Sequence, residues 1–240
     1  MKLAKLKQAI AEANSICVLS GAGMSTASGI PDFRSKNGIY TKFDDVEYLL
    51  SESYYYRSPK QFWESFKAIF FMNDIHKYEA NIGHKWLAEL EKQGKHITVV
   101  TQNIDGLHRK AGSTHILEVH GTISSAHCPK CKTSYSLETI LQHDVPRCEL
   151  DDMILKPDVV LFEGQVKHLD EAFHYAQHCD LFITLGSSLQ VYPIKQLPLL
   201  TKRARVKSVI INLEETEMDD LFDLVIHDDI TSVVGQLKNK

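Results

Sequence analysis

Side chains that could carry acid–base chemistry follow two short apolar runs of the sequence. Asn103 and Asp105 come soon after the run at 97–100, and His120 comes directly after the run at 116–119. Histidine has a reference pKa of about 6.5, so it can accept a proton close to neutral pH. Buried amide and carboxylate groups are costly without partners. The pattern therefore indicates either a catalytic base beside a polar binding site, or a solvated histidine near an Asx cap.

A glycine-rich turn follows the first apolar run, at 16–19. Glycines at a strand-to-helix turn let the backbone approach a pyrophosphate, whose charge suits the N–H groups of a helix N-terminus. The match to the fingerprint Gly-x-Gly-x-x-Gly is imperfect, because Thr26 stands at the third glycine position. Asp32, Phe33 and Arg34 lie just beyond and could cover a nicotinamide ring and a phosphate. The turn alone fits a nucleotide site or a plain strand-to-helix connection.

Strand-sized apolar runs alternate with helix-sized segments along most of the chain. This pattern predicts an α/β fold, with a doubly wound, mostly parallel, Rossmann-like sheet and a small zinc-binding insert domain. We expect a nucleotide-binding domain at 1–125 and 153–240, a cysteine-rich module at 126–152, and a cofactor loop with a helical insert at 32–80. The runs expected to be strands are 16–19, 97–100, 116–119, 159–162, 181–185, 209–213 and 224–226. The segments expected to be helices are 1–14, 59–71, 79–93, 169–178 and 230–238.

The composition limits the classes of partner. The net charge of −4 over 240 residues does not indicate a nucleic-acid or anionic-membrane surface, so we expect neither partner. No apolar run approaches the roughly 20 residues that span a bilayer, and the first helix lacks the apolar core of an export signal. We therefore expect a cytoplasmic protein, and we take it to be a monomer.

Three of the five cysteines lie in the expected insert. Cys128 and Cys131 form a Cys-x-x-Cys pair, and Cys148 follows after sixteen intervening residues. Three thiolates leave a structural tetrahedral zinc site one ligand short. A second Cys-x-x-Cys would end at position 151, where Asp151 could ligate zinc as a harder donor. We expect a structural zinc at these four residues. The alternatives are His127 or His143 as the fourth ligand, or weak or absent zinc binding.

The chain resembles the sirtuin family, in the family's motif order and over nearly its whole length. The motifs that carry the resemblance are GAGMS at 21–25, GIPDFRS at 29–35, TQNIDGLH at 101–108, HG at 120–121 and GSSLQV at 186–191. The resemblance implies an enzyme that binds NAD, consumes it as a co-substrate and removes acyl groups from protein lysines. Thr26, which departs from the dinucleotide fingerprint, is itself what the family shows.

The resemblance also implies roles for individual residues. Asp105 would hold the nicotinamide carboxamide, Gln102 and Asn103 would lie near the nicotinamide ribose, and Asn212 would meet the adenosine ribose. His120 and Asn103 would be catalytic. The cofactor-binding residues that the resemblance implies are Gly21, Ala22, Gly23, Ser25, Thr26, Ile30, Asp32, Phe33, Arg34, Gln102, Asn103, Ile104, Asp105, Gly186, Ser187, Ser188, Asn212 and Asp229.

In the implied mechanism, nicotinamide leaves as the acyl oxygen of the lysine amide attacks the ribose C1′. His120 then takes a proton from a ribose hydroxyl, which attacks the resulting imidate. The products would be nicotinamide, deacylated lysine and O-acyl-ADP-ribose. The acyl-lysine substrate would bind as an added β-strand between two segments of this chain, at Val160, Leu161, Phe162 and Val191.

Two details bear on substrate choice. The family usually has Phe-Gly-Glu where this chain reads Phe162, Glu163 and Gly164, and glycine permits backbone angles that glutamate does not. Desuccinylating members carry a Tyr-x-x-Arg, whose places here we assign to Phe66 and Ile69. An apolar pocket without that arginine would favour acetyl or longer neutral acyl groups, because a buried unpaired carboxylate is costly. The alternative is that both residues are helix core.

Other functions remain in competition on the sequence alone. ADP-ribosyl transfer and NAD hydrolysis use the same fold, but members specialised that way tend to alter the histidine or the Asn-x-Asp, and both are intact here. A non-catalytic NAD-responsive binding module and a hydride-transferring dehydrogenase are the remaining alternatives. Deacylation agrees best with all of the motifs.

Overall fold

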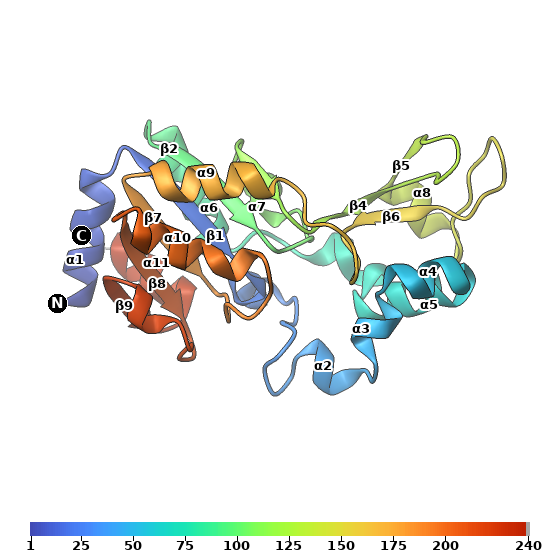
Figure 1. Cartoon of the computed structure of the whole chain (residues 1–240), viewed down its shortest axis with the longest axis horizontal. Helices are drawn as coiled ribbons and strands as arrows, with labels where there is room; N and C mark the ends of the chain where they lie inside the picture. Colours follow the sequence, from blue (N-terminus) through green and yellow to red (C-terminus); the bar gives the residue numbers. More distant parts are fainter. Residues whose placement is uncertain (239–240) are drawn as a thin grey trace.

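A parallel sheet forms the framework of the larger lobe in the computed structural model, which describes residues 1–238 apart from the side chain of Asn73 (Figure 1). Its strands lie in the order β3-β2-β1-β7-β8-β9, and every neighbouring pair is parallel. The bounds are β1 (Ser15–Ser20), β2 (His96–Thr101), β3 (Ile116–Glu118), β7 (Leu181–Leu185), β8 (Lys207–Asn212) and β9 (Leu224–His227). The predicted doubly wound, Rossmann-like sheet is confirmed.

The strand order reverses at β1. The chain leaves β1 toward β2 on one side, and later returns to place β7 on the other side, with Ile16 opposite both Ile97 and Leu181. The connections after β1 and β7 therefore run in opposite directions from adjacent strands. In open α/β sheets this topological switch point, at the carboxyl ends of the strands, is where ligands bind.

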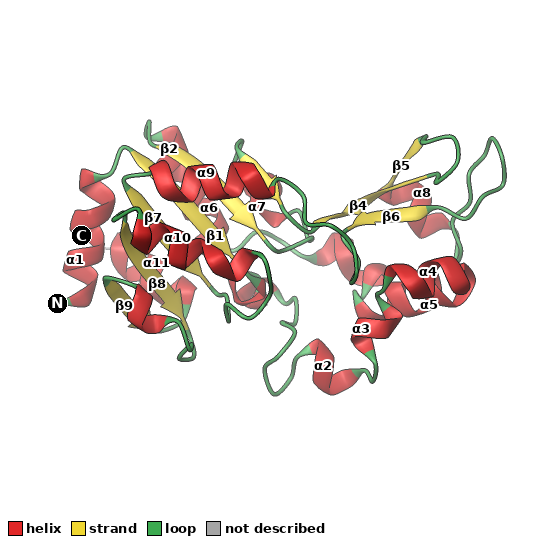
Figure 2. Ribbon diagram, in the orientation of Figure 1, coloured by secondary structure: helices red, strands yellow, loops and turns green. Residues whose placement is uncertain are grey.

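Alternate residues of the central strands bury opposite faces of the sheet. Ile16 and Val18 pack with one group of helices, whereas Cys17 and Leu19 pack with another. The first group is α1 (Lys2–Glu12), α6 (Ile82–Lys92) and α11 (Ile230–Lys238). The second group is α9 (Leu169–His178) and α10 (Leu197–Arg203). Figure 2 shows helices in front of and behind the strands of this lobe. Burial on both faces explains why these strands read as continuous apolar runs.

The smaller lobe combines short helices with a small antiparallel sheet in the order β5-β4-β6 (Figure 2). Its strands are β4 (Gly121–His127), β5 (Ser134–Ser136) and β6 (Lys156–Val159). Its helices are α2 (Ile39–Lys42), α3 (Val46–Leu49), α4 (Glu52–Arg57), α5 (Pro59–Ile69) and α8 (Leu137–Gln142). Trp63 is fully buried here and donates its indole N–H to the carbonyl of Leu155 at 2.7 Å, so the helices and the small sheet share one core.

The remaining elements are short and connect these parts. They are the helix α7 (Leu107–Ala111) and the 3-10 turns η1 (Ala22–Met24), η2 (Thr26–Ser28), η3 (Met72–Lys77), η4 (Ile194–Gln196) and η5 (Asp219–Leu221). No helix among residues 1–238 has the length and apolar character needed to cross a membrane.

One sequence prediction for the smaller lobe is wrong. We expected a strand at 159–162, but the strand in this region is β6, which ends at Val159 and pairs antiparallel with β4 rather than joining the parallel sheet. The small sheet begins at Gly121 and ends at Val159. The pairing of β4 with β6 is interrupted between Gly121 and Ala126, which breaks the alternation of buried and exposed residues. Serines at 124 and 125 add no apolar signal, so no strand pattern is visible in the sequence.

Asn81 links the start of α6 to the glycine turn. Its side-chain oxygen accepts from the N–H of Gly83 at 2.9 Å, which caps the helix. Its amide nitrogen donates to the carbonyl of Met24 at 2.8 Å and to Ser28 Oγ at 3.1 Å. One side chain therefore satisfies the helix end and holds the turn.

We expect Asn81→Ala to lower the free energy of unfolding by about 1–2 kcal/mol, because it removes a helix cap and leaves the carbonyl of Met24 without its donor. Asn81→Asp keeps the helix cap but loses the donor to Met24, and should lower the free energy of unfolding by less than Asn81→Ala does. Urea unfolding measures both, with the exposed Gln93→Ala at the other end of α6 as the control. An unfolding free energy for Asn81→Ala equal to that of the wild type would contradict this role.

Candidate active site

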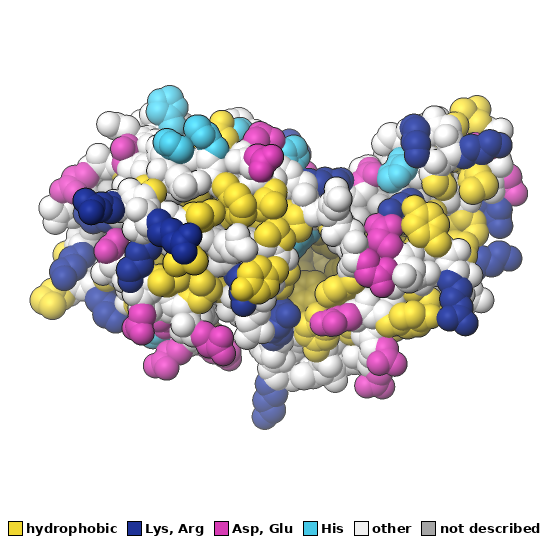
Figure 3. All heavy atoms as spheres, in the orientation of Figure 1, with side chains coloured by type: hydrophobic (Ala, Val, Ile, Leu, Met, Phe, Trp, Pro, Cys, Tyr) yellow, Lys and Arg dark blue, Asp and Glu magenta, His cyan; other side chains and the backbone are white. Residues whose placement is uncertain are grey.

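A cleft of about 630 Å³ lies between the two lobes, at the carboxyl ends of the parallel strands. Figure 3 shows the hollow between the lobes, with apolar side chains at its wall. All residues predicted from the sequence to be catalytic, to bind NAD or to bind peptide line this cleft. The structure thus brings together residues from Gly21 to Asp229, while the predicted metal ligands lie apart in the smaller lobe.

The glycine turn packs directly on the end of β7. Gly21 donates its N–H to the carbonyl of Leu185 at 3.0 Å, and Gly23 donates to the carbonyl of Gly186 at 2.9 Å. A Cβ on Gly21 would come within 2.7 Å of the Gly186 carbonyl oxygen, so this approach excludes a side chain. These glycines bring the ends of β1 and β7 into contact and place the turn along the cleft, with the N–H of Ala22 as its remaining donor.

Three polar side chains form a connected network beneath the cleft. Asn103 donates its side-chain N–H groups to the carbonyl of Gly21 at 3.0 Å and to Ser25 Oγ at 3.1 Å. Ser25 donates in turn to Asp105 Oδ2 at 2.7 Å. Asp105 Oδ1 also accepts the N–H of Leu107 at 2.9 Å, and burial nevertheless raises the pKa of the Asp105 carboxyl. The network fixes the Asn-x-Asp pair against the glycine turn.

His120 follows β3 and is held by the neighbouring strand end. Its Nδ1 lies 3.2 Å from the carbonyl oxygen of Gln102. A carbonyl oxygen only accepts hydrogen bonds, so Nδ1 carries the proton and Nε2 keeps a free lone pair. Burial lowers the pKa of His120, although the bond to Gln102 opposes the shift. The ring is therefore neutral at pH 7, with Nε2 as its basic atom.

The segment that follows β6 forms one wall of the cleft. Val160 donates its N–H to the carbonyl of His120 at 2.7 Å, which joins this wall directly to the histidine. The exposed side chain of Phe162 lies on the same wall, and Val191 belongs to the wall contributed by the larger lobe. These are the two segments that the sequence predicted to receive a peptide.

The residues expected to line an acyl pocket need correction. Phe66 and Ile69 are both 0% exposed and belong to the core of the smaller lobe. Helix α5 buries Phe62, Phe66 and Ile69 on one face, which is the spacing of a core-facing helix. Phe70 and Phe71, just beyond the end of α5, line the cleft instead.

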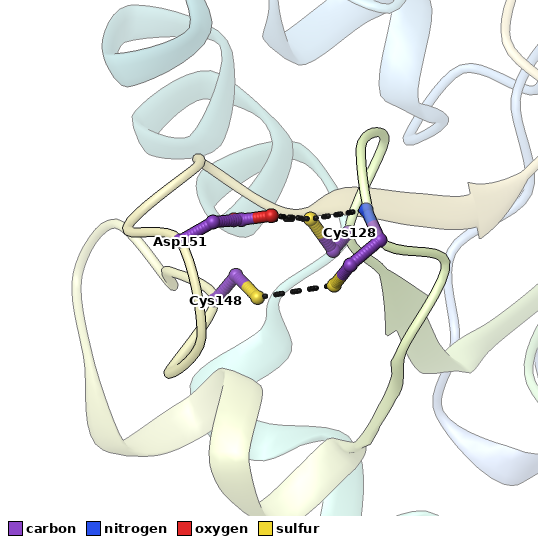
Figure 4. Close-up of side chains that lie close together, drawn as sticks. Cys128, Cys148 and Asp151 are labelled. Atoms are coloured by element: carbon purple, nitrogen blue, oxygen red, sulfur yellow. Dashed lines mark hydrogen bonds between the residues drawn. The ribbon is translucent and has the colours of Figure 1, made fainter.

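Three thiols and one carboxylate converge in the smaller lobe (Figure 4). The four ligand atoms of Cys128, Cys131, Cys148 and Asp151 lie within 4.8 Å of one another. The sulfurs of Cys131 and Cys148 are 3.5 Å apart, close to the separation of about 3.8 Å that two zinc thiolates show in a tetrahedral site. Among the candidates for a fourth ligand, the structure brings Asp151 to the thiols. His127 instead contacts Asp158 at 2.6 Å.

Comparison with known proteins agrees with this arrangement. A model of the Sir2 family matches residues 21–193. NAD-dependent protein deacetylase 2 of Geobacillus kaustophilus is 48% identical over 241 residues, which cover 100% of this chain and 98% of that protein. The NAD-dependent protein deacetylase of Bacillus subtilis is 46% identical over 242 residues, with 98% of each chain covered. The chain belongs to the Sir2 family.

Solved Sir2 structures share the whole fold. A Sir2 histidine-to-alanine variant with deacetylated p53 peptide and 3′-O-acetyl ADP ribose has a TM-score of 0.91 at 35% identity, covering 99% of this chain and 97% of that one. Sir2Tm bound to a propionylated peptide has a TM-score of 0.87 at 33% identity, with the same coverage. The predicted sirtuin resemblance is confirmed over the full chain.

Two buried histidines of this Sir2 chain were not predicted from the sequence. His84 and His108 are 0% and 2% exposed, and their ring centroids are 4.8 Å apart. His108 Nε2 lies 2.8 Å from Ser20 Oγ, and neither Nδ1 atom has a hydrogen-bond partner. Burial lowers the pKa of His84 to about 4 and that of His108 to about 3. His108 stands within the TQNIDGLH motif, which could have drawn attention to it.

Both histidines should make this Sir2 protein less stable in mild acid. Their folded pKa values lie below the unfolded value of about 6.5, so the unfolded state binds more protons between about pH 6.5 and pH 4. Each should reduce the free energy of unfolding by up to about 1.4 kcal/mol per pH unit over that range. Urea unfolding from pH 7 to pH 5 should show a shallower slope for His108→Gln than for the wild type. The exposed His96→Gln is the control, and an equal slope for His108→Gln would contradict the assignment.

Proposed function

We propose that the protein is an NAD-dependent lysine deacylase, chiefly a deacetylase, which converts NAD, acyl-lysine and one water into nicotinamide, deacylated lysine and O-acyl-ADP-ribose. The observation that carries the proposal is the place of His120. A neutral histidine with a free Nε2 faces the same cleft as the glycine turn and Asp105. The names of the relatives and the acyl-peptide complexes of similar Sir2 structures support the same activity.

The cleft has the size and the donors that NAD requires. Its volume of about 630 Å³ falls in the range of small-molecule sites. The turn at Gly21 to Gly23 would lie against the pyrophosphate and donate the N–H of Ala22, because the N–H groups of Gly21 and Gly23 already bond to Leu185 and Gly186. Ser187, Ser188 and Asn212 would lie near the phosphates and adenosine ribose. Arg34, on the loop that follows the turn, would complement the phosphate charge. When bound, NAD supplies an electrophilic ribose carbon with nicotinamide as the leaving group.

The polar network positions the groups at the nicotinamide end. Asp105 would hold the carboxamide, in a pocket formed with Ile30, Phe33 and Ile104. Asn103 donates its amide N–H groups to Gly21 and Ser25. Its Oδ1 is therefore the atom that can accept a hydrogen bond from a ligand in the cleft. A fixed acceptor of this kind orients the ribose without any rearrangement of the chain.

His120 would act as the general base. Its Nε2 would remove a proton from a ribose hydroxyl, while Nδ1 remains hydrogen-bonded to Gln102. Because burial lowers the pKa of His120, the base form predominates at neutral pH. The carbonyl of Gln102 would also stabilise the imidazolium that forms when Nε2 takes the proton.

The acyl-lysine substrate would enter as an added strand between Val160, Leu161 and Phe162 on one side and Val191 on the other. Main-chain pairing of this kind accepts varied side chains. Arg34 is the one Lys or Arg among the described residues that line the cleft, and it belongs to the cofactor loop. A succinyl carboxylate would therefore lack a dedicated cation, which favours acetyl and longer neutral acyl groups.

The cysteine cluster would hold a structural zinc. The donor set of three thiolates and one carboxylate suits Zn²⁺, and backbone N–H groups of Lys130 and Cys131 lie 3.4 Å from Cys128 Sγ, as in a zinc knuckle. The ion would fold the smaller lobe, because metal binding in such a module contributes folding free energy. That the protein is a monomer and acts in the cytoplasm stays a prediction from the sequence.

We expect His120→Ala to reduce NAD-dependent deacetylation of an acetyl-lysine peptide by about 100-fold to 10,000-fold, since it removes the general base. The rate for the wild type should fall as the pH drops below the lowered pKa of His120, and should be flat above it. Peptide mass spectrometry measures the rate, with the exposed His174→Ala as the control. Full deacetylation by His120→Ala would contradict the role of His120 as general base. NAD cleavage without loss of acetyl would contradict the deacylase proposal and favour NAD hydrolysis or ADP-ribosyl transfer.

We expect purified protein to contain about one zinc per chain, and Asp151→Ala to lose the metal more readily to a chromogenic chelator. Asp151→Cys should hold zinc more tightly than the wild type, because it supplies a fourth soft donor. His143→Ala, a histidine outside the cluster, serves as the control. Equal zinc retention in Asp151→Ala and the wild type would show that the carboxylate is not a ligand.

A further inference from the structure

The turn that carries the peptide-binding wall has glutamate where glycine is expected. The N–H of Gly164 donates to the carbonyl of Leu161 at 2.9 Å and closes a four-residue turn. Glu163 is the third residue of that turn and has a φ of 73°. A positive φ at the third position is a requirement that usually selects glycine. Something must therefore hold Glu163 in this conformation.

The following residue cannot exchange places with it. A Cβ on Gly164 would lie 2.9 Å from the carbonyl oxygen of Leu161 and 3.3 Å from Glu52 Oε1. The order of glutamate then glycine is thus built into the local packing, and the turn of this chain differs in detail from the Phe-Gly-Glu usual in the family.

The carboxylate of Glu163 is hydrogen-bonded to the start of α4. Its Oε2 accepts the N–H of Ser53 at 3.0 Å and the hydroxyl of Ser53 at 2.7 Å. These bonds lower the pKa of the Glu163 carboxyl, which keeps it ionised at neutral pH. Charge-assisted bonds of this kind are stronger than bonds between neutral groups, so they can stabilise the unusual backbone angle.

The adjacent residue pairs with the same segment through its backbone. Phe162 donates its N–H to the carbonyl of Leu50 at 3.0 Å and accepts the N–H of Glu52 at 3.1 Å. Residues 162 and 163 are therefore joined to residues 50–53 by both backbone and side-chain bonds. The loop is thus fixed to residues 50–53, and its residues 161–164 line the cleft.

We propose that Glu163 is a positioning residue for the acyl-lysine peptide. Its hydrogen bonds to Ser53 hold the loop of Leu161 to Gly164 in the shape that receives the added strand, so peptide affinity depends on them and turnover does not. This inference rests on the proposed deacylase function. It also implies that Oε2, which is occupied by Ser53, acts through the shape of the loop rather than through direct contact with the substrate.

Steady-state kinetics at saturating NAD test the proposal. We expect Glu163→Ala to raise the peptide KM by about fivefold to tenfold, as for the loss of a charge-assisted hydrogen bond, with kcat and the KM for NAD unchanged. Ser53→Ala should raise the peptide KM by a smaller factor, because the backbone N–H of residue 53 remains. Glu163→Gln keeps an acceptor oxygen and should recover most of the wild-type affinity.

Two further variants distinguish the positioning role of Glu163 from a general loss of structure. Glu163→Gly removes the strain at a φ of 73° but also the bonds, and should still raise the peptide KM. Glu138→Ala removes an exposed acid from the first turn of α8, in the same lobe but outside the cleft lining, and should behave as the wild type. A wild-type KM in Glu163→Ala, or an equal loss in kcat and in affinity for NAD, would overturn the proposal. A large effect of Glu163→Ala without any effect of Ser53→Ala would point instead to direct contact with the substrate.

Amide hydrogen exchange without substrate tests the hydrogen bonds separately from the activity. The N–H groups of Phe162 and Gly164 should exchange about tenfold faster in Glu163→Ala than in the wild type, and at the wild-type rate in Glu138→Ala. If the wild type shows no deacetylation, the proposed function fails, while exchange still reports whether Glu163 orders the loop. Unchanged exchange in Glu163→Ala would overturn the inference whatever the activity.

Discussion

The close backbone contact between the end of β1 and the end of β7 is the constraint on which the rest of the site depends. Gly21 and Gly23 bond to the carbonyls of Leu185 and Gly186, and a Cβ on Gly186 would approach the N–H of Met24 to 2.4 Å. Only glycine fits at this junction, where the strand order reverses. The contact turns the chain after β1 into the cleft and provides the carbonyl of Gly21 that Asn103 then uses.

A buried, hydrogen-bonded layer supports the reacting groups. Ser25 connects Asn103 to Asp105, and Ser20 connects His108 to Thr101. Burial favours the uncharged forms of both buried histidines and of Asp105. Such buried polar groups are already oriented before a ligand binds. They reduce the stability of the fold unless each keeps its hydrogen-bond partners, because little water is available to replace them. His120 stands at the edge of this layer, where it keeps a free nitrogen and contact with the cleft.

The parallel sheet could be predicted because burial on both faces makes its strands continuous apolar runs. The polar ends of those strands then indicated the cleft, and the sirtuin motifs indicated the chemistry. The smaller lobe was harder to predict, since the irregular pairing of β4 and its serines remove the alternation that reveals a strand. The acyl pocket was misplaced for another reason. The spacing of Phe62, Phe66 and Ile69 shows that one face of α5 is apolar, but it does not show whether that face meets a core or a cleft.

The stoichiometry of the products is the sharpest test of NAD-dependent deacylation by this protein. Wild-type protein would be incubated with NAD and an acetyl-lysine peptide, and nicotinamide, deacetylated peptide and acetyl-ADP-ribose would be quantified together by mass spectrometry. We expect the three products to appear in equal amounts and only when both substrates are present. Nicotinamide formed together with free ADP-ribose while the peptide keeps its acetyl group would contradict deacylation by this protein.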